Sequence, residues 1–281
     1  MASSRSRSKP APTPGRRVAP APYLVRPRDL LKPAGFPIHP FDQAHGVDTS
    51  GLVPARHLAT GHANDEHVTA YYGVAPSILR SLIERWRETV PAHPISSYTF
   101  VDIGCGKGRA LLVASELRFR IVVGIELNPK LAAIARENVE SWTHSHAMDQ
   151  TAPLLTPIEV FEQDALDLTL PTGPTLIFLF HPFEAPLLRK VLRRIESQIA
   201  EHDKAAAGSQ LDLDILYVNA ECANVLDRHP AFKRLYAGHV PMSPEDHAAD
   251  LEAIAQQKEY GSTGDEECAI YRYVGRAKPT G

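Results

Sequence analysis

Three closely spaced glycines form the most informative motif of the sequence, Val101-Asp-Ile-Gly-Cys-Gly-Lys-Gly-Arg109. Gly104, Gly106 and Gly108 allow a tight turn and let a ligand lie directly against the backbone. A helix is expected to follow, and its first N–H groups are free to bind a ligand. Asp102 precedes the loop, where its carboxylate attracts an amine cation and repels a diphosphate. The motif therefore predicts a site for a ligand that carries positive charge.

Two ligand classes use a glycine turn of this kind. Dinucleotide-binding enzymes have the spacing G-x-G-x-x-G, whereas here the third glycine comes one residue early and Arg109 follows it. A phosphate-binding loop of the form G-x-x-x-x-G-K-[ST] does not occur in the sequence. S-adenosylmethionine, which carries an amine and a sulfonium, fits the acidic turn better than a dinucleotide does. A dehydrogenase that binds a nicotinamide cofactor is the alternative.

Further acidic residues follow the expected ends of later strands. Glu126 lies 22 positions after Gly104, where a carboxylate can accept hydrogen bonds from both hydroxyls of a ribose. This feature does not separate the two ligand classes, because dinucleotide folds place an acid similarly. Asp164, followed by Ala165, can accept a hydrogen bond from an adenine amino group, and Asp167 is a competing candidate. We therefore expect contacts to a nucleoside at both places.

Other side chains are candidates for contact with a second substrate, the acceptor of a transferred group. His181 ends a central strand, and an imidazole suits proton transfer near neutral pH. Phe183 is a candidate wall of the acceptor pocket. Tyr71 and Tyr72 lie in a segment that precedes the first helix, with Tyr72 the catalytic candidate of the two. After the fifth strand, the polar lining candidates are Asn219 and Glu221.

The elements that must position these residues alternate between strand and helix. Apolar runs predict strands at 98–103, 121–126, 158–161, 175–180 and 211–218. Apolar residues at helical spacing predict helices at 76–90, 107–118, 131–139 and 187–199. This alternation is typical of an α/β fold with a doubly wound, mostly parallel sheet and helices on both faces. Strand-like segments at 232–240 and 268–274, with a short helix around 244–258 between them, predict an antiparallel closing pair.

Four segments together resemble the class I, seven-β-strand S-adenosylmethionine-dependent methyltransferases. They are the glycine loop, Gly124-Ile-Glu-Leu-Asn-Pro129, Asp164-Ala165 and Leu179-Phe-His-Pro-Phe183. The resemblance covers roughly residues 70–275 and is greatest to uncharacterised bacterial members; protein-lysine methyltransferases of the class are more distant. It implies a Rossmann-like, seven-stranded sheet with an antiparallel seventh strand. It also implies that Asp102, Gly104 and Gly106 surround the methionine end of the cofactor. Glu126 would then contact the ribose, and Asp164 would lie near the adenine.

One segment departs from the pattern of that family. Many amino-group methyltransferases of the class have Asp or Asn followed by two prolines and an aromatic residue at the exit of the fourth strand. This chain has His181-Pro-Phe183 there instead. We expect a methyltransferase with an unidentified acceptor, such as a protein lysine or another nitrogen nucleophile. The alternatives are a non-catalytic S-adenosylmethionine-binding protein and, less favoured, an NAD-binding oxidoreductase.

Composition indicates the class of protein and its domain organisation. The 281 residues are 43% hydrophobic and 22% charged, as in globular proteins. Residues 1–33 are basic and proline-rich and predict a disordered tail, for which a transit peptide or contact with nucleic acid or an acidic partner is an alternative. We expect residues 34–92 to form a segment and helix that cover the cofactor site. Residues 93–277 are expected to form the cofactor-binding methyltransferase domain. Oligomeric state is left open.

Charge and residue usage exclude several classes of partner. The net charge of −3 does not favour RNA as the acceptor, so a protein or a small molecule is expected. No apolar run is long enough to span a membrane, and three separated cysteines fit a cytoplasmic protein. The histidines lack metal-ligand spacing, and His144 and His146 are expected in a loop, so no metal site is predicted. Cys105 is not expected to act as a nucleophile.

Overall fold

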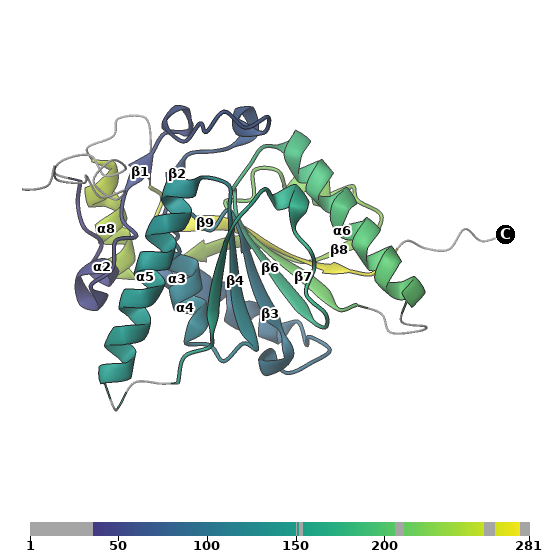
Figure 1. Ribbon diagram of the computed structural model, residues 1–281, viewed down its shortest axis with the longest axis horizontal. Coiled ribbons are helices and arrows are strands. Elements are labelled where there is room, and N and C mark those ends of the chain that lie inside the picture. The colour runs from purple at the N-terminus through teal and green to yellow at the C-terminus, as the bar shows by residue number, and fades with distance from the viewer. Residues whose placement is uncertain (1–35, 150, 152–153, 206–210, 256–261, 276–281) are drawn as a thin grey trace, which may run out of the picture.

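The computed structural model describes residues 36–149, 151, 154–205, 211–255 and 262–275, around a seven-stranded sheet (Figure 1). The strands lie side by side in the order β5, β4, β3, β6, β7, β9, β8. In chain order, they are β3 (Thr99–Ile103), β4 (Ile121–Glu126), β5 (Ile158–Glu162), β6 (Thr175–Phe180), β7 (Leu213–Val218), β8 (Phe232–Pro241) and β9 (Asp265–Tyr273). Residues 1–33, predicted as a tail, and 276–277 at the end of the predicted domain lie outside the described residues.

Five neighbouring strands are parallel, and the last two close the sheet. β5, β4, β3, β6 and β7 pair in parallel, whereas β9 is antiparallel to both β7 and β8. The predicted doubly wound sheet with an antiparallel seventh strand is therefore confirmed. The chain proceeds outward from β3 to β5 on one side and then from β6 to β7 on the other. The order of strands thus reverses between β3 and β6, and open α/β sheets bind ligands beyond the carboxyl ends of strands at such a point.

Helices cover both faces of the sheet, as the alternation predicted (Figure 1). One face carries α3 (Pro76–Glu88), α4 (Arg109–Ser115) and α5 (Pro129–Met148), and the other carries α6 (Ala185–Ala205) and α7 (Ala223–Asp227). β6 shows why both faces are buried: Leu176 and Phe178 join one core, while Ile177 and Leu179 join the other. Among the described helices, none has the length and apolarity that a membrane crossing requires.

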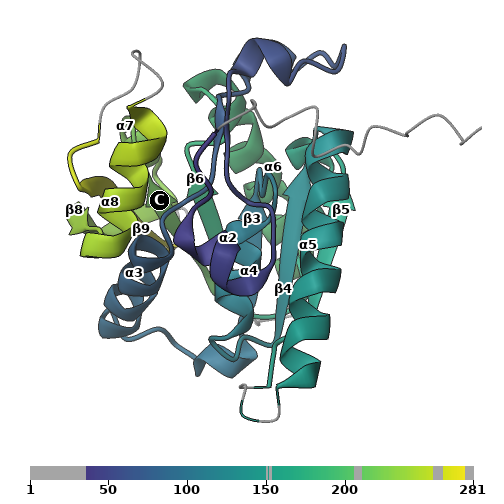
Figure 2. The ribbon, with the colours of Figure 1, turned by 90° about the vertical axis from the view of Figure 1, so that its left-hand side faces the viewer.

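The segment before α3 crosses the carboxyl edge of the sheet, and we call residues 36–74 the strap. It contains α2 (Pro40–His45), the short strands β1 (Leu52–Val53) and β2 (Tyr71–Tyr72), and the 3-10 turns η1 (Ala55–His57) and η2 (Asp65–His67). Two further 3-10 turns are η3 (Ile95–Ser97) and η4 (Ala165–Asp167). Figure 2 shows α2 in front of α4, between α3 and α5. The helix predicted around 244–258 is α8 (Pro244–Ile254), and 256–258 lie outside the described residues.

The prediction of a loop at His144 and His146 was wrong, because α5 continues through both residues to Met148. The extra turns are held by Trp142, which is fully buried and donates a hydrogen bond to the Ser115 hydroxyl at 3.1 Å. The His146 ring packs against the same indole at a tilt, with ring centroids 4.1 Å apart. Tertiary packing against α4 therefore lengthens this helix beyond its apolar repeat.

Candidate active site

The glycine loop joins β3 to α4 at the point where the order of strands reverses. Gly104 and Gly106 have φ angles of +81° and +56°, a backbone conformation that glycine adopts at little cost. The loop is also covered closely. A Cβ atom added to Gly106 would lie 2.3 Å from the Tyr71 ring, and one added to Gly104 would lie 2.5 Å from Cβ of Pro182. Only glycine therefore fits at these two positions.

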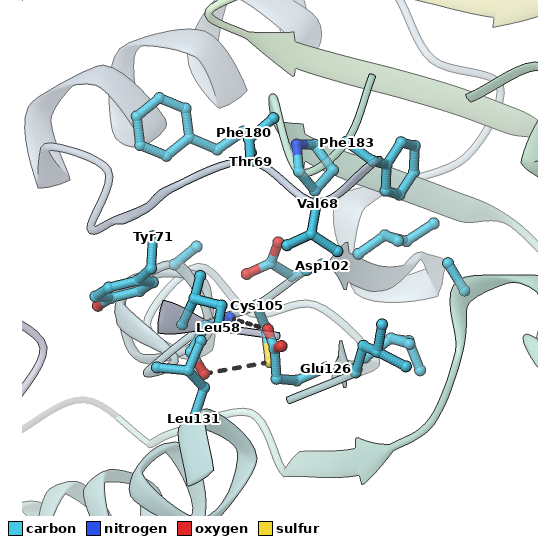
Figure 3. A pocket seen from close by; sticks show the side chains of 18 of the residues that line it. Leu58, Val68, Thr69, Tyr71, Asp102, Cys105, Glu126, Leu131, Phe180 and Phe183 are labelled. Atoms are coloured by element: carbon cyan, nitrogen blue, oxygen red, sulfur yellow. Dashed lines mark hydrogen bonds between the residues drawn. The ribbon is translucent and has the colours of Figure 1, made fainter. Parts of the chain in front are cut away.

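Asp102 and Glu126 lie on the neighbouring strands β3 and β4 and are 3% and 7% exposed. Glu126 is fixed by the backbone, because its two oxygens accept hydrogen bonds from the N–H groups of Gly106 and Asn128, each at 2.8 Å. Among the described residues, no donor reaches the carboxylate of Asp102. Figure 3 shows that carboxylate pointing into the open middle of a pocket. Asp102 is therefore a buried carboxyl group that can accept hydrogen bonds from a bound ligand.

Burial changes the acidity of both carboxyl groups. It raises the pKa of Asp102 well above its ordinary value, and the charge of Glu126 raises it further. Burial also raises the pKa of Glu126, against the opposing effect of the backbone N–H groups of Asn128 and Gly106. A cation placed beside Asp102 would reverse this effect by stabilising the charged form. The pair therefore forms a site whose chemistry favours a positively charged ligand.

The far end of the pocket is formed by the turn after β5. Asp164 is the N-cap of η4, and its carboxylate accepts hydrogen bonds from the Leu166 N–H at 2.9 Å and from the Asn64 side-chain amide at 2.6 Å. Ala165 also lines the pocket. Asp167, the competing candidate, instead lines a separate hollow beside β4 and β5. The structure therefore brings Asp164, and not Asp167, to the pocket that holds Asp102 and Glu126.

The remaining walls of the pocket are mostly apolar. Leu58 and Val68 come from the strap, Leu131 from α5, and Phe183 and Leu187 from the start of α6 and the turn before it. The empty space is about 860 Å³, its open mouth included. An apolar enclosure with a few convergent polar groups is the usual form of a cofactor site.

Comparison with known families agrees with this geometry. Residues 101–186, which run from the glycine loop to the start of α6, match the family model described as a methyltransferase domain. Over these residues the chain is similar to methyltransferase domains, in agreement with the predicted class I, S-adenosylmethionine-dependent methyltransferase. S-adenosylmethionine is the cofactor that this class predicts for the pocket. We call the pocket around Asp102 and Glu126 the cofactor pocket.

Solved structures of low sequence identity were also found. Magnesium protoporphyrin IX methyltransferase from Synechocystis is 10% identical, with a TM-score of 0.40, over 71% of this chain and 79% of that chain. The YcgJ protein from Bacillus subtilis is 10% identical, with a TM-score of 0.41, over 71% and 99%. TrmN from Thermus thermophilus is 15% identical, with a TM-score of 0.41, over 72% and 49%. No curated protein matches the sequence.

The residues of the cofactor pocket fit S-adenosylmethionine. The unpartnered carboxylate of Asp102 suits its ammonium group, and Glu126 and Asp164 are spaced along the pocket toward the turn after β5. The carboxylate of Asp164 accepts hydrogen bonds from the Asn64 amide and the Leu166 N–H, and it keeps lone pairs for the adenine amino group that the resemblance implies.

Two basic residues of the glycine loop anchor the strap of the methyltransferase, and sequence reasoning missed both roles. Lys107 is fully buried, and its Nζ donates to the backbone oxygen of Ser50 at 2.6 Å. Arg109 donates to the Thr49 hydroxyl at 2.6 Å and lies 3.8 Å from a carboxylate oxygen of Asp42. Lysine and arginine are seldom buried unless paired, and their partners Ser50 and Thr49 lie too far away in the sequence for a local pattern to indicate the pairing. They hold the strap across the cofactor pocket.

The two tyrosines of β2 have different positions. The Tyr71 ring lies on Gly106, and its hydroxyl donates to the backbone oxygen of Thr49 at 2.6 Å. Burial raises the pKa of Tyr71 well above its ordinary value, so its hydroxyl stays protonated. Tyr72 donates to Asp250 of α8 and lines the cofactor pocket and a second, neighbouring cavity. Of the pair, Tyr72 is the one that faces both spaces.

The second cavity lies beside the cofactor pocket, and the two share the lining residues Thr69, Ala70, Tyr72 and Phe180. Its empty space is about 1800 Å³, its open mouth included. Its lining contains six carboxylates and, within the described residues, no lysine or arginine. We call it the acidic cavity, after Glu184, Glu221, Asp250, Asp265, Glu266 and Glu267.

His181 and Asn219 both line the acidic cavity rather than the cofactor pocket. They follow β6 and β7, and their φ angles of 39° and 47° are uncommon for residues other than glycine. The His181 ring is held between the Tyr217 hydroxyl, 3.1 Å from Nδ1, and Glu221, 3.5 Å from Nε2. Phe183 instead lies in the wall of the cofactor pocket. Strained backbone that aims polar side chains into a cavity is common at functional sites.

Two other kinds of chemistry receive little support from the described residues. No group of three or more histidine, cysteine or acidic side chains there is arranged to hold a metal ion. Cys105 is 6% exposed, and burial together with the charges of Asp102 and Glu126 raises the pKa of its thiol. A thiol kept protonated in this way is a poor nucleophile.

Proposed function

We propose that this methyltransferase transfers the methyl group of S-adenosylmethionine to the nitrogen of a cationic acceptor, such as a lysine side chain or another alkylamine. The observation that carries the proposal is the acidic cavity, which opens beside the cofactor pocket and is lined by six carboxylates. Such a cavity attracts cations and repels phosphate-rich acceptors. The acceptor would approach along the shared wall formed by Thr69, Tyr72 and Phe180.

Cofactor binding is assigned to the three carboxylates of the cofactor pocket and to the glycine loop. Asp102 would hold the ammonium group, Glu126 the ribose hydroxyls, and Asp164 with Ala165 the adenine. The bound cofactor supplies an electrophilic methyl group together with its own leaving group. The protein therefore has to align the acceptor and exclude water, and the strap and the apolar walls suit that task.

An ammonium acceptor must lose a proton before its nitrogen can attack. His181 is a candidate for accepting that proton, because Glu221 beside it would stabilise the imidazolium that results. Glu266 is a second candidate in the acidic cavity, since burial and the charges of Asp250 and Asp265 raise its pKa to about 7. Tyr72 would orient the acceptor through its hydrogen bond to Asp250.

The test is incubation of the full chain with S-adenosylmethionine labelled in its methyl group and an extract of cells. The extract is then separated into protein, RNA and small-molecule fractions. Label on amine nitrogen in the protein or small-molecule fraction is the expected result. Label confined to RNA would overturn the acceptor assignment, and binding of cofactor without transfer to any fraction would overturn the catalytic one.

Cofactor choice is tested separately by calorimetric titration. S-adenosylmethionine should bind at micromolar concentration, whereas NAD should not, because Asp102 would face the negative charge of a diphosphate. Tighter binding of NAD would contradict the assignment of Asp102 to an ammonium group.

A further inference from the structure

A basic hollow lies between α6 and α7 with the turn that follows it, and it is separate from both cavities. Its walls include Arg189 and Arg193 of α6, and Arg228, His229 and Pro230 from the turn after α7. The empty space is about 710 Å³, its open mouth included. It shares no lining residue with the cofactor pocket or the acidic cavity. A ligand bound there would therefore not compete directly with cofactor or acceptor.

The charges of this hollow are not used to hold the fold together. Arg189, Arg193 and Arg228 are exposed, and none of the three has an ion-pair partner in the part of the chain that the structure describes. His229, by contrast, is paired with Glu196 at 3.4 Å. Like charges four residues apart on a helix destabilise it by about 0.2–0.5 kcal/mol, so stability does not account for Arg189 and Arg193.

The same helix extends the basic surface. Lys190 and Arg194 form a second pair of exposed cations four residues apart, directly beside the first pair. The sequence adds a further concentration of positive charge, since residues 1–33 contain eight basic residues and one acid. The whole chain nevertheless has a net charge of −3. Its cations are thus gathered on particular segments, as they are in proteins that bind polyanions.

We propose that the basic hollow, defined by Arg189, Arg193 and Arg228, binds the phosphodiester backbone of a nucleic acid. Guanidinium groups bind phosphate oxygens through paired hydrogen bonds, and arginine is the preferred residue for such contacts. An anionic membrane surface is less suited to this hollow. Membrane-surface binding relies on exposed apolar side chains beside the cations, and the one large apolar residue of the lining, Val225, is buried.

The proposal does not depend on the identity of the methyl acceptor. It places nucleic-acid binding on α6 and amine methylation in the acidic cavity, whose carboxylates repel phosphate. The two sites would serve together when the acceptor amine belongs to a protein that is itself bound to nucleic acid.

The experiment measures binding of fluorescent 20-nucleotide RNA and DNA duplexes to the full chain by anisotropy, between 50 and 200 mM salt. The triple variant Arg189→Gln, Arg193→Gln and Arg228→Gln should bind at least about tenfold more weakly, with a salt dependence reduced by about two to three units of slope. The matched control changes three exposed cations elsewhere, Arg56→Gln, Arg118→Gln and Lys130→Gln, and should stay within about twofold of the parent.

The outcomes separate the hollow from general electrostatic attraction. Preference for one of the two duplexes identifies the source of the phosphodiester. Equal weakening of duplex binding in both triple variants would overturn the proposal. Unchanged duplex binding in the α6 variant would also overturn it, because the basic tail would then supply the affinity. Binding to phosphatidylglycerol vesicles without binding to either duplex would also overturn it. Melting temperatures and cofactor affinity of both variants, each expected to match the parent, exclude misfolding.

Discussion

The cofactor pocket and the acidic cavity adjoin each other, yet they hold their carboxylates in different ways. In the cofactor pocket, Asp102 and Glu126 lie on adjacent parallel strands, are almost fully buried, and border one short loop. In the acidic cavity, the carboxylates come from β9, α8 and the turns after β6 and β7, and most are partly or fully exposed. Asp250, at 6% exposed, is the exception.

This difference indicates which part of the site is fixed by the cofactor and which part is free to suit an acceptor. A buried pair on adjacent strands, with Glu126 held by backbone N–H groups, presents one geometry and therefore suits one ligand. An open cavity whose carboxylates are mostly exposed tolerates acceptors of several shapes, provided that they are cationic. Specificity at such a surface depends on charge more than on fit.

The largest effect is expected when the charge of Asp102 is removed. Asp102→Asn should weaken S-adenosylmethionine binding at least about a hundredfold, because a buried ion pair loses one partner at a cost of about 3–5 kcal/mol. The same change should raise the free energy of unfolding without cofactor, since the carboxylate is buried without a donor. Calorimetry and urea unfolding measure the two effects.

Asp102→Asn is expected to weaken cofactor binding and to increase stability, and this combination distinguishes a binding role for Asp102 from a structural one. Asp167→Asn is the control, because Asp167 lies outside the cofactor pocket and should leave affinity unchanged. If Asp102→Asn destabilises the protein and spares cofactor binding, the residue is a structural group and the comparison between the two cavities is wrong.

Glu126→Ala should weaken cofactor binding by at least about tenfold, or about 1.4 kcal/mol, as expected for lost ribose contacts. Unlike Asp102, Glu126 accepts hydrogen bonds from Gly106 and Asn128, so its removal should also lower the free energy of unfolding. The pair of variants therefore shifts stability in opposite directions while both lose affinity. An unchanged dissociation constant in Glu126→Ala would remove the ribose assignment.

The sequence predicted that these residues would lie together, because the determinants of their grouping are local. Asp102, Gly104 and Gly106 lie in one strand and turn, and Glu126 ends the next strand, so strand order alone brings them together. The sheet, its antiparallel closing pair and the two-faced burial of β6 follow from apolar periodicity in the same way.

The acidic cavity could not be predicted, because it is assembled from distant segments. Tyr72 of the strap donates a hydrogen bond to Asp250 of α8, which lies 178 positions away in the sequence. No local sequence pattern predicts that contact. His181 and Asn219 were recognised as polar ends of strands, but their common cavity depends on how α8 packs. The burial of Lys107 and Arg109 likewise depends on the docking of the strap.

Within the acidic cavity, Asp250→Asn should raise the half-saturating concentration of acceptor by about fivefold to tenfold, or about 1 kcal/mol. Asparagine keeps an acceptor for the Tyr72 hydroxyl and removes the charge that attracts a cation. Initial rates of label transfer to the protein fraction of a cell extract measure the change, and cofactor affinity should not move. Glu140→Gln, an exposed acid on α5, is the control. Equal effects in both variants would indicate general charge rather than this cavity.

The smallest effect concerns Glu266. Burial and the charges of Asp250 and Asp265 raise its pKa from 4.5 to about 7, so the folded protein retains a proton that the unfolded chain has released. Its contribution to stability is complete below pH 4.5 and is lost as the pH rises toward 7 and above. Glu266→Gln should therefore match the parent's pH dependence at low pH and gain stability relative to it between pH 4.5 and 7. Urea unfolding of both proteins at pH 4, 5.5 and 7.5 measures this difference, and a difference independent of pH would show that Glu266 titrates as an ordinary exposed acid.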